Sequence, residues 1–300
     1  MTPPDHPVRE LTGLPAPAKL NLFLHITGRR ADGYHLLQSV FMLVDWQDTI
    51  DLVLREDGQL SREDSGTRLA LPDNDLCVRA ADALRQATGC TLGAHIRLHK
   101  QIPAEAGMGG GSSDAATCLI GLNRLWHLGL ARAELARIGL ALGADVPFFI
   151  GGHNAWVEGV GEQLTPVHLP RRRFVVVKPP TGASTPKIFA SPALKRDTKT
   201  ATMQGFAADE NAEAMLDMEK LFAHTRNDLQ PVAQGLCPDI ERCILWLFSQ
   251  GLQGRMTGSG SAVFAPLPDA FDALAPLPEG WVARICSSLD AHPLTDWISG

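Results

Sequence analysis

A glycine-rich segment, residues 103–116, restricts the possible folds of this chain more than any other part of its sequence. It reads Pro-Ala-Glu-Ala-Gly-Met-Gly-Gly-Gly-Ser-Ser-Asp-Ala-Ala and is followed by apolar residues at helical spacing. Glycine permits positive φ angles and lets a ligand approach the main chain closely. Because the start of a helix has unpaired N–H groups and the positive end of the helix dipole, such a junction favours an anion, most often phosphate. We therefore expect a phosphate-binding loop, then a helix with Ser112 or Ser113 as its N-cap and Asp114 in its first turn.

The loop differs from the two commonest phosphate-binding motifs. A P-loop has a lysine directly after its last glycine, whereas Ser112 follows Gly111 here. A dinucleotide fingerprint needs a third glycine and an acidic residue on a later strand, and only its first half is matched, by Gly107 and Gly109. A flexible solvent turn is the plainest alternative, but such turns rarely open onto a strongly apolar helix. The pattern indicates another phosphate-binding architecture, with a lysine supplied from elsewhere in the chain.

Composition indicates a globular protein large enough for two domains. The chain has 300 residues, of which 45% are hydrophobic and 20% are charged, so a core can form without disulfide bonds. The net charge of −6 argues against nucleic acid as a partner. The six cysteines lack metal-binding or redox spacing, which is typical of thiols in a reducing cytoplasm. The first seven residues lack the pattern of a signal peptide, and no apolar run is long enough to cross a membrane. We expect a cytoplasmic protein, a monomer or homodimer, that binds small molecules and neither membrane nor nucleic acid.

The first half of the chain combines strands and helices. Residues 16–26 alternate with period two, so we expect a half-buried strand with Lys19 and Asn21 side by side on its polar face. Asp32-Gly33 predicts a tight turn. The remaining predictions are strands at 39–46, 49–54, 94–99 and 148–150, an irregular insertion at 56–74, and helices at 75–88 and 131–142, the latter ended by Gly143.

A change in composition near residues 165–173 suggests a domain boundary. We place an N-terminal domain at 1–167 and a C-terminal domain at 168–300. The three arginines at 171–173 are interpreted as a solvated linker in preference to a nucleotide-binding patch. In the second domain we expect strands at 174–178, 255–257, 261–266 and 281–285, helices at 217–223 and 238–250, and a loop with little regular structure at 191–216.

Three separate segments resemble the motifs of the GHMP kinases, the family of kinases for galactose, homoserine, mevalonate and phosphomevalonate. They are Pro17-Ala18-Lys19-Leu20-Asn21-Leu22, the glycine loop at 103–116, and Thr257-Gly258-Ser259-Gly260-Ser261-Ala262. The resemblance implies an α+β, two-domain GHMP kinase fold. Its N-terminal α/β domain has a mixed sheet similar to domain 2 of ribosomal protein S5, and its C-terminal domain is ferredoxin-like. The implied active site lies in the cleft between them.

Further segments resemble one branch of this family, which acts in the non-mevalonate isoprenoid route. They are Gly28–His35, Gly109–Ala116 and Leu142–Phe149, and the Asp-Gly-Tyr-His sequence in the first is the most specific. The branch implies that ATP, with Mg²⁺ present, phosphorylates the 2-hydroxyl of 4-diphosphocytidyl-2-C-methyl-D-erythritol, a sugar alcohol that carries a cytidine diphosphate. The alternative within the family is a kinase for another small alcohol such as homoserine or mevalonate. Those substrates have no base for Tyr34 and His35 to recognise.

Lys19 and Asp145 are the expected catalytic pair. Phosphoryl transfer depends on positioning and charge compensation more than on covalent chemistry, and the attacking alcohol is a weak nucleophile. We expect Asp145 to accept the proton of this alcohol, and Lys19 to keep the carboxylate ionised and to stabilise the migrating phosphoryl group. Taken singly, an aspartate after a helix is usually a turn residue and a lysine on a strand is usually solvated. The order of the three motifs favours the catalytic interpretation.

The resemblance also implies two sets of binding residues. The expected ATP site comprises Lys100, Pro103, Gly107, Met108, Gly109, Gly110, Gly111, Ser112, Ser113 and Asp114. Ser113, or Ser112 beside it, is the candidate ligand of Mg²⁺. The expected acceptor site comprises Asn21, Tyr34, His35, Thr185, Phe189, Gly258 and Ser259. We expect Tyr34 to stack on the cytosine and His35 to hydrogen-bond its edge. Asp114 and Asp75 stand where related sequences lead us to expect asparagine, so the contacts with adenine can differ there.

Three other function classes match parts of the sequence. A nicotinamide-dependent oxidoreductase could use the glycine loop for a dinucleotide, but its first strand would have to lead straight into the loop, and it does not. A non-catalytic binding protein would not need both Lys19 and Asp145. A hydrolase is disfavoured because no Gly-x-Ser-x-Gly segment is present.

Overall fold

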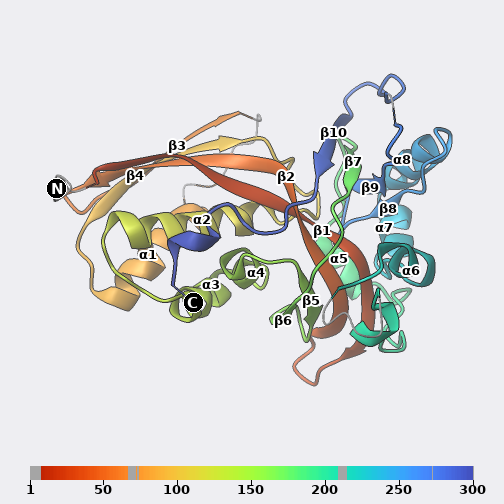
Figure 1. Ribbon diagram of the computed structural model, residues 1–300, viewed down its shortest axis with the longest axis horizontal. Coiled ribbons are helices and arrows are strands. Elements are labelled where there is room, and N and C mark those ends of the chain that lie inside the picture. Colours follow the sequence, from red (N-terminus) through yellow and green to blue (C-terminus); the bar gives the residue numbers. More distant parts are fainter. Residues whose placement is uncertain (1–7, 67–71, 73, 209–214, 272, 300) are drawn as a thin grey trace.

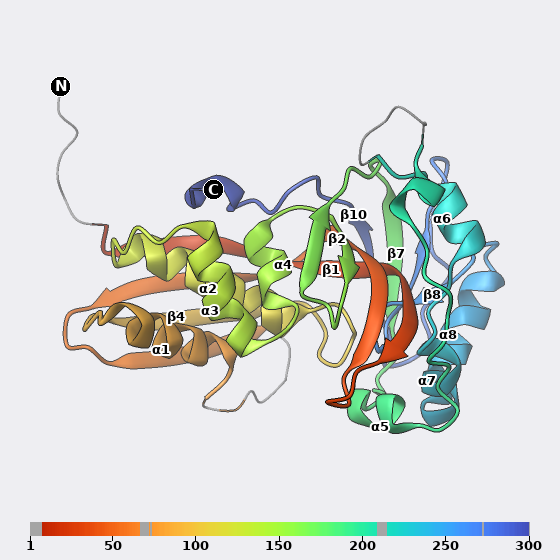
Figure 2. The same cartoon turned by 90° about the horizontal axis from the view of Figure 1, so that it is seen from below.

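Two sheets form the framework of the molecule, and a shared apolar layer joins them (Figure 1; Figure 2). The computed structural model describes residues 8–66, 72, 74–208, 215–271 and 273–299. Our interpretations of residues 1–7, and of parts of the segments 56–74 and 191–216 (67–71, 73 and 209–214), lie outside the described residues.

The first sheet is built around one long antiparallel hairpin. It contains β1 (Glu10–Arg29), β2 (His35–Arg55), β3 (Leu60–Gly66), β4 (Gly93–Lys100), β5 (Ala155–Glu158) and β6 (Gln163–Pro166). β1 pairs with β2 over nearly its whole length. The other edge of β2 pairs with β4 through residues 49–55 and with β5 through residues 39–41. The hairpin therefore runs as one element from the helical side of the molecule to the second sheet (Figure 1).

β2 is continuous where we predict two strands, at 39–46 and 49–54. Between them the pairing with β1 shifts register, from Pro17 opposite Gln47 to Ala18 opposite Val44. Extra residues on one strand form a bulge, which bends the strand without ending its hydrogen bonding. The prediction of two separate strands is therefore wrong. A bulge and a turn interrupt the alternation of a sequence in the same way, so the pattern does not distinguish them.

The prediction of an irregular insertion at 56–74 is wrong for residues 60–66, which form β3. This strand pairs in parallel with β4 at the edge of the sheet. Leu60 is its only large apolar residue, so the segment lacks the alternation of a half-buried strand. Polar cross-strand pairs support it instead, such as the Ser61 hydroxyl 2.9 Å from His95 Nδ1.

Four helices cover one face of the first sheet. They are α1 (Leu76–Thr88), α2 (Gly110–Leu125), α3 (Arg132–Leu142) and α4 (Val146–Gly151). α2 is buried on nearly all sides because α1, α3 and α4 flank it (Figure 2). The predicted helices at 75–88 and 131–142 are confirmed as α1 and α3. Gly143 follows α3, but its φ of 177° is extended and makes no left-handed cap.

The predicted strand at 148–150 is wrong, because this segment lies in α4. A short apolar run does not reveal whether it is helical or extended. Pro147 lies at the first turn of α4, where its fixed φ and missing N–H are tolerated, and Gly152 ends the helix with a φ of 77°. Asp145, which precedes Val146, is therefore placed by the start of a helix.

The second sheet is antiparallel in the order β10-β7-β9-β8. Its strands are β7 (Arg173–Lys178), β8 (Arg255–Met256), β9 (Val263–Pro266) and β10 (Val282–Ser287). The helical elements of the second half of the sequence are α5 (Thr185–Ala190), η1 (Met203–Phe206), α6 (Met218–His224), α7 (Gln230–Leu236), α8 (Pro238–Phe248) and η2 (Thr295–Trp297). The predicted strands of this half and the helices α6 and α8 are confirmed. The sequence analysis does not predict α5 and α7, because helices of six or seven residues are too short to show a period.

β1 is buried on both faces, so the prediction of a half-buried strand is wrong. Leu20 and Leu22 lie in the apolar layer shared with the second sheet. Lys19 and Asn21 are only 3% and 1% exposed. Alternation alone does not show that other segments, among them the glycine loop and the residue before α4, cover the polar positions. Buried polar groups need partners, so these two side chains must be held by other parts of the fold.

The end of the chain returns to the first sheet. Leu294 and Ile298 are buried in the core between that sheet and its helices, and Ser288 forms a bridge with Val44 of β2. Figure 1 shows the C-terminal segment beside α2 and α3. A division at residue 167 stays a prediction, with the segment 288–298 packed on the first half of the molecule.

All six cysteines are free thiols, and five of them are buried. Within the described residues, no helix combines the length and apolar character needed to span a bilayer.

Candidate active site

Lys19 of β1 and Asp145 at the start of α4 lie next to each other. Lys19 Nζ is 3.5 Å from Asp145 Oδ2. The ammonium also donates a hydrogen bond to Asn21 Oδ1 and lies 4.2 Å from the centroid of the Phe41 ring. The Lys19 side chain is 4% exposed and that of Asp145 is 31% exposed. The carboxylate is therefore open to a ligand, with the ammonium buried behind it.

The charges of this pair depend on each other. Burial lowers the pKa of Lys19, while Asp145 opposes the shift through its charge and a hydrogen bond. A buried ammonium without a carboxylate partner is costly. The two side chains therefore form one electrostatic unit.

The glycine loop approaches the pair with its main chain. Gly107 and Gly109 have φ angles of 72° and 71°, which glycine adopts without strain. A Cβ on Gly107 would overlap the carbonyl oxygen of Thr257, and one on Gly109 would lie 3.0 Å from the Phe149 ring. Glycine is required here by both backbone angle and space.

The loop is attached to the fold on two sides. The Lys19 N–H donates to the Met108 carbonyl at 3.0 Å. From the second half of the chain, the Ser261 N–H donates to the Glu105 carbonyl at 2.8 Å. The loop is thus held against β1 and the turn before β9 at once, which fixes the direction of its free N–H groups.

α2 begins earlier than predicted. Its first residue is Gly110 and its N-cap is Gly109, so the expectation that Ser112 or Ser113 caps the helix is wrong, and Asp114 lies beyond the first turn. Ser113 is fully buried, and its hydroxyl donates to the Pro17 carbonyl at 2.7 Å. The expected Mg²⁺ ligand at this position therefore does not face a cavity. Ser112 does, and it lines two of them.

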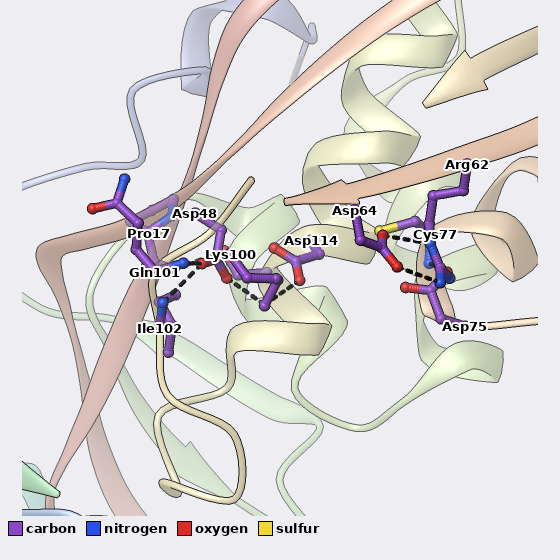
Figure 3. A network of polar contacts seen from close by, with 11 residues as sticks. Pro17, Asp48, Arg62, Asp64, Asp75, Cys77, Lys100, Gln101, Ile102 and Asp114 are labelled. Atoms are coloured by element: carbon purple, nitrogen blue, oxygen red, sulfur yellow. Dashed lines mark hydrogen bonds and ion pairs between the residues drawn. The ribbon is translucent and has the colours of Figure 1, made fainter. Parts of the chain in front are cut away.

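Lys100 lies in a buried cluster with two carboxylates (Figure 3). Its ammonium contacts Asp48 Oδ2, and it lies 2.6 Å from Asp114 Oδ2. Burial raises the pKa of Asp114 to about 8, against the opposing charge of Lys100. Burial alone would lower the pKa of Lys100, but Asp114 and Asp48 raise it overall. The ammonium that we expect near adenine is thus paired within the protein, although Lys100 and Asp114 both line the cavity at the glycine loop.

Asp75 also interacts with groups of the protein itself (Figure 3). As N-cap of α1, its Oδ1 accepts from the N–H groups of Cys77 and Val78 at 3.1 and 3.2 Å. The same oxygen lies 2.6 Å from Arg62 Nη1. Its role at the rim of the cavity is therefore structural.

The turn after β8 supports the third motif. Thr257 Oγ1 accepts from the Asn21 N–H at 2.9 Å. The Asn227 carboxamide donates to the carbonyls of Met256 and Gly258, both at 2.8 Å. The Ser259 hydroxyl lies 2.6 Å from that of Thr185. The turn is thereby fixed against β1 and α5.

Two adjoining cavities surround these groups. The larger, of about 670 Å³, is lined by the glycine loop, the start of α1 and the start of α5. The smaller, of about 370 Å³, is lined by Lys19, Asn21, Asp145 and Gly258. Residues common to both linings are Gly107, Gly109, Ser112, Thr185 and Ser259. All predicted ATP-site residues except Ser113 line the larger cavity. A group bound there can be transferred to one bound beside Asp145.

A third cavity, of about 590 Å³, contains the predicted base-binding residues. Tyr34 is 65% exposed, and the rings of His35 and Phe189 have centroids 5.0 Å apart. Leu37, Val160 and Phe189 line both this cavity and the one beside Asp145. The three cavities thus adjoin one another in a row, with the cavity beside Asp145 in the middle.

Comparisons with known proteins agree with this geometry. A model described as "GHMP kinases N terminal domain" matches residues 75–153, and one described as "GHMP kinases C terminal" matches residues 203–279. The chain is 59% identical over 298 residues to the 4-diphosphocytidyl-2-C-methyl-D-erythritol kinase of Polaromonas naphthalenivorans, with 98% of each chain covered. It is 60% identical over 296 residues to the enzyme of that name from Paracidovorax citrulli, with 97% of this chain and 99% of that one covered. The chain belongs to the 4-diphosphocytidyl-2-C-methyl-D-erythritol kinase family.

Solved structures give the same result for the fold. A crystal structure of 4-(cytidine 5'-diphospho)-2C-methyl-D-erythritol kinase matches with a TM-score of 0.70 and 30% identity, covering 93% of this chain and 98% of that one. Homoserine kinase from Cytophaga hutchinsonii matches with a TM-score of 0.68 at 15% identity, covering 97% and 98%, which shows a common fold. The expected α+β GHMP kinase fold is confirmed.

Membership of this family makes the chain a kinase that uses ATP and acts on a small molecule. The oxidoreductase, hydrolase and non-catalytic alternatives are thereby excluded. Three residues that support the site, Asp48, Arg196 and Asn227, were not predicted. Each acts through hydrogen bonds to residues far away in sequence, and no local pattern marks it.

Proposed function

We propose that this chain transfers the γ-phosphoryl group of ATP to the 2-hydroxyl of 4-diphosphocytidyl-2-C-methyl-D-erythritol. The bond between the β-bridging oxygen and the γ-phosphorus breaks, a bond between the substrate oxygen and that phosphorus forms, and the hydroxyl proton passes to Asp145. The products are ADP and the 2-phosphate. The reaction requires that the nucleotide and the alcohol meet at the boundary of the two adjoining cavities.

Asp145 is proposed as the general base and Lys19 as the cation that compensates charge. The exposed Asp145 carboxylate faces the smaller cavity, and the buried Lys19 ammonium lies 3.5 Å from it. A positioned general base contributes typically ~10²–10⁴-fold to the rate. This ion pair in the smaller cavity, beside the glycine loop that lines both cavities, is the single observation that carries the proposal.

The larger cavity is proposed to hold ATP. The N–H groups of the loop from Gly107 to Gly111 and the start of α2 form an anion-binding surface. When Mg²⁺ is bound, it neutralises phosphate charge, and Ser112 can supply a hydroxyl ligand because it lines both cavities. Among the described residues, no group of three histidine, cysteine or acidic side chains could hold a metal by itself. A single hydroxyl such as that of Ser112 fits a cation whose other ligands are mainly phosphate oxygens.

The cavity of Tyr34, His35 and Phe189 is proposed to bind the cytosine of the acceptor. An exposed tyrosine beside a second aromatic ring suits a flat base, and stacking is worth ~1–3 kcal/mol per base in nucleic-acid complexes. Asn21, Thr185, Gly258 and Ser259 surround the cavity between base and nucleotide, where the sugar alcohol and its diphosphate would lie.

We also propose that the active site is built from two domains, 1–167 and 168–300, and that the protein works in the cytoplasm as a monomer or homodimer. The free thiols of the chain fit a reducing compartment.

An acceptor panel tests the proposal. The protein is incubated with ATP and Mg²⁺ and with 4-diphosphocytidyl-2-C-methyl-D-erythritol, homoserine or mevalonate, and ADP release is measured. We expect rapid release with the cytidine compound alone. Comparable kcat/KM for homoserine or mevalonate would contradict the proposed substrate.

A further inference from the structure

Arg196 holds the histidine of the base-binding cavity. Its Nε–H lies 3.0 Å from His35 Nε2. Its Nη1 donates to the Leu194 carbonyl at 2.9 Å, and its Nη2 donates to the carbonyls of Phe189 and Ser191 at 3.0 and 2.8 Å. With four hydrogen bonds, the guanidinium is fixed in place. It connects the ring of His35 to the end of α5, which carries Phe189.

The direction of the hydrogen bond to His35 is determined by chemistry. Arginine has N–H donors and no acceptor, so His35 Nε2 must accept. A neutral imidazole has one N–H, which must then lie on Nδ1. An imidazolium would present an N–H at Nε2 to the guanidinium, so this contact excludes the charged ring. Among the described residues, none forms a hydrogen bond with His35 Nδ1.

The surroundings of His35 disfavour its charged form. Burial lowers the pKa of His35, and the charges of Arg196 and Arg29 lower it further. The other titratable groups lining the cavity are Tyr34 and Asp32, and Asp32 is paired with Arg30 at 2.7 Å. From α5 and from the turn before β6, Phe189 and Val160 line the cavity, and neither is charged.

We propose that Arg196 is a specificity-determining positioning residue, which holds His35 as the neutral Nδ1–H tautomer and so selects cytosine over uracil. The proposal rests on the function proposed above. On the pairing edge, cytosine N3 accepts a hydrogen bond, whereas uracil N3 carries a hydrogen and donates. A ring that offers only a donor pairs with cytosine N3 and leaves uracil N3–H opposed to another N–H. Without Arg196 the ring can change tautomer, and its Nδ1 can then accept from uracil.

The simpler alternative is that Arg196 only stabilises the main chain after α5, through its hydrogen bonds to carbonyl oxygens there. Arg132 provides the matched control for this role. It likewise donates four hydrogen bonds, all of them to main-chain carbonyls (Ile150, Gly151, Thr295 and Ile298), and it lines none of the three cavities. Arg132→Met should lower thermal stability and leave the KM for the acceptor unchanged.

The first experiment measures the tautomer in the free enzyme. Nitrogen-15 NMR of histidine-labelled protein is recorded from pH 8 to pH 5, with His35 assigned by the loss of its signals in His35→Gln. We expect the neutral ring of the unmodified protein to be protonated at Nδ1. In Arg196→Met we expect mixed tautomers and a ring that titrates closer to its ordinary pKa. A ring protonated at Nε2 in the unmodified protein would overturn the proposal.

The second experiment measures selectivity. The ratio of kcat/KM for the cytidine substrate to that for its uridine analogue is determined for Arg196→Met, Arg196→Lys and Arg132→Met. The variant weakens the hydrogen bond from His35 Nδ1 to cytosine N3 and permits one from uracil N3. We therefore expect Arg196→Met to lower the ratio roughly tenfold, with kcat and the KM for ATP nearly unchanged. The KM for the cytidine substrate should rise more at pH 8 than at pH 6 in Arg196→Met, because protonation at pH 6 places an N–H on Nδ1 again. Arg196→Lys, which keeps a cationic donor, should restore part of the ratio.

The outcomes separate this proposal from the function on which it rests. An unchanged ratio, or a KM that rises equally at all pH values in Arg196→Met, would overturn the role of Arg196 while leaving the kinase function intact. If Tyr34→Ala and His35→Ala both leave the KM for the cytidine substrate unchanged, the proposed base-binding cavity itself is wrong. The NMR measurement uses no substrate and decides the tautomer in either case.

Discussion

At the scale of single residues, the buried lysine of β1 illustrates how this fold balances function against stability. Lys19 is nearly inaccessible to solvent, and burial lowers its pKa. Asp145, Asn21 and the Phe41 ring compensate it only in part, because the carboxylate is 3.5 Å away and partly exposed. Charged groups buried in this way rarely add to stability, and apolar replacements of similar shape are often neutral or stabilising. The ammonium is therefore explained by its chemistry and not by its packing.

Replacement of Lys19 should therefore lower the rate without lowering the stability. Lys19→Met should lower kcat by at least ~10²-fold, because charge compensation of the migrating phosphoryl group is lost, while the melting temperature should stay level or rise. Steady-state kinetics and thermal melts check both. Lys178 is the matched control: it is also buried, but its ammonium donates only to the carbonyls of Pro179 and Thr181. Lys178→Met should keep kcat, which would separate the effect of the Lys19 position from the effect of removing a buried ammonium. A large loss of stability in Lys19→Met with normal kcat would contradict the account.

At the scale of elements, the site depends on how one strand and one turn are joined. The segment before α7 forms a bridge with β1, as the Leu24 N–H donates to Arg226 and the Asp228 N–H donates to Leu24. From this segment Asn227 reaches the turn of Gly258 with both of its N–H hydrogens. A buried carboxamide therefore links the strand that bears Lys19 to the turn that borders the acceptor cavity, in addition to the bond between the Asn21 N–H and Thr257.

Exchanging that carboxamide for a carboxylate tests the connection. Asn227→Asp places oxygen against two carbonyls, so the turn should move and kcat should fall roughly tenfold or more, since small misplacements near a reacting group have large effects. Asn154 offers a control of the same kind: it is also buried, and it joins the Leu43 N–H to the Leu289 carbonyl away from the cavities. Asn154→Asp should lose comparable thermal stability with an unchanged kcat. Equal kcat values for the two variants would show that Asn227 has only a structural role.

The same elements show what could be predicted from the sequence. The glycine loop, the helix from Leu76 and the alternation around Lys19 were predictable because each is a local pattern with a local cause. β3 was not predictable because its polar edge strand is stabilised by β4, and α4 was not because six apolar residues fit a strand equally well. The partners of Lys100 could not be inferred either, since the pairing of β2 with β4 brings Asp48 next to it and no local pattern gives that register.

At the scale of the whole molecule, the two sheets are tied together by the end of the chain. After β10 the segment 288–298 crosses back to the helical side of the first sheet (Figure 1). Within it His292 is almost fully buried, and its Nδ1 accepts from the Leu294 N–H at 3.1 Å. Burial, followed by the charge of Arg132, lowers the pKa of His292 to about 4. The docked segment therefore contains a group that cannot be protonated without cost.

Stability should consequently fall in acid through His292. Because its pKa is depressed in the folded protein, the unfolded chain binds a proton first as pH falls below about 6.5, and the loss continues to about pH 4. A difference of roughly 2.5 units from the ordinary value corresponds to about 3 kcal/mol. Thermal melts of the unmodified protein and His292→Gln from pH 8 to pH 4 should show a shallower acid slope in the variant. Identical slopes would contradict this assignment.

The central claim is that Asp145 takes the proton of the acceptor alcohol beside Lys19, and Asp145→Asn tests it most directly. The substitution keeps the size and removes the base, so kcat should fall by at least ~10²-fold while the KM for ATP stays nearly unchanged. Single-turnover measurements with saturating ATP and the cytidine substrate give the rate of the chemical step itself. A rate for Asp145→Asn close to that of the unmodified enzyme would contradict the account.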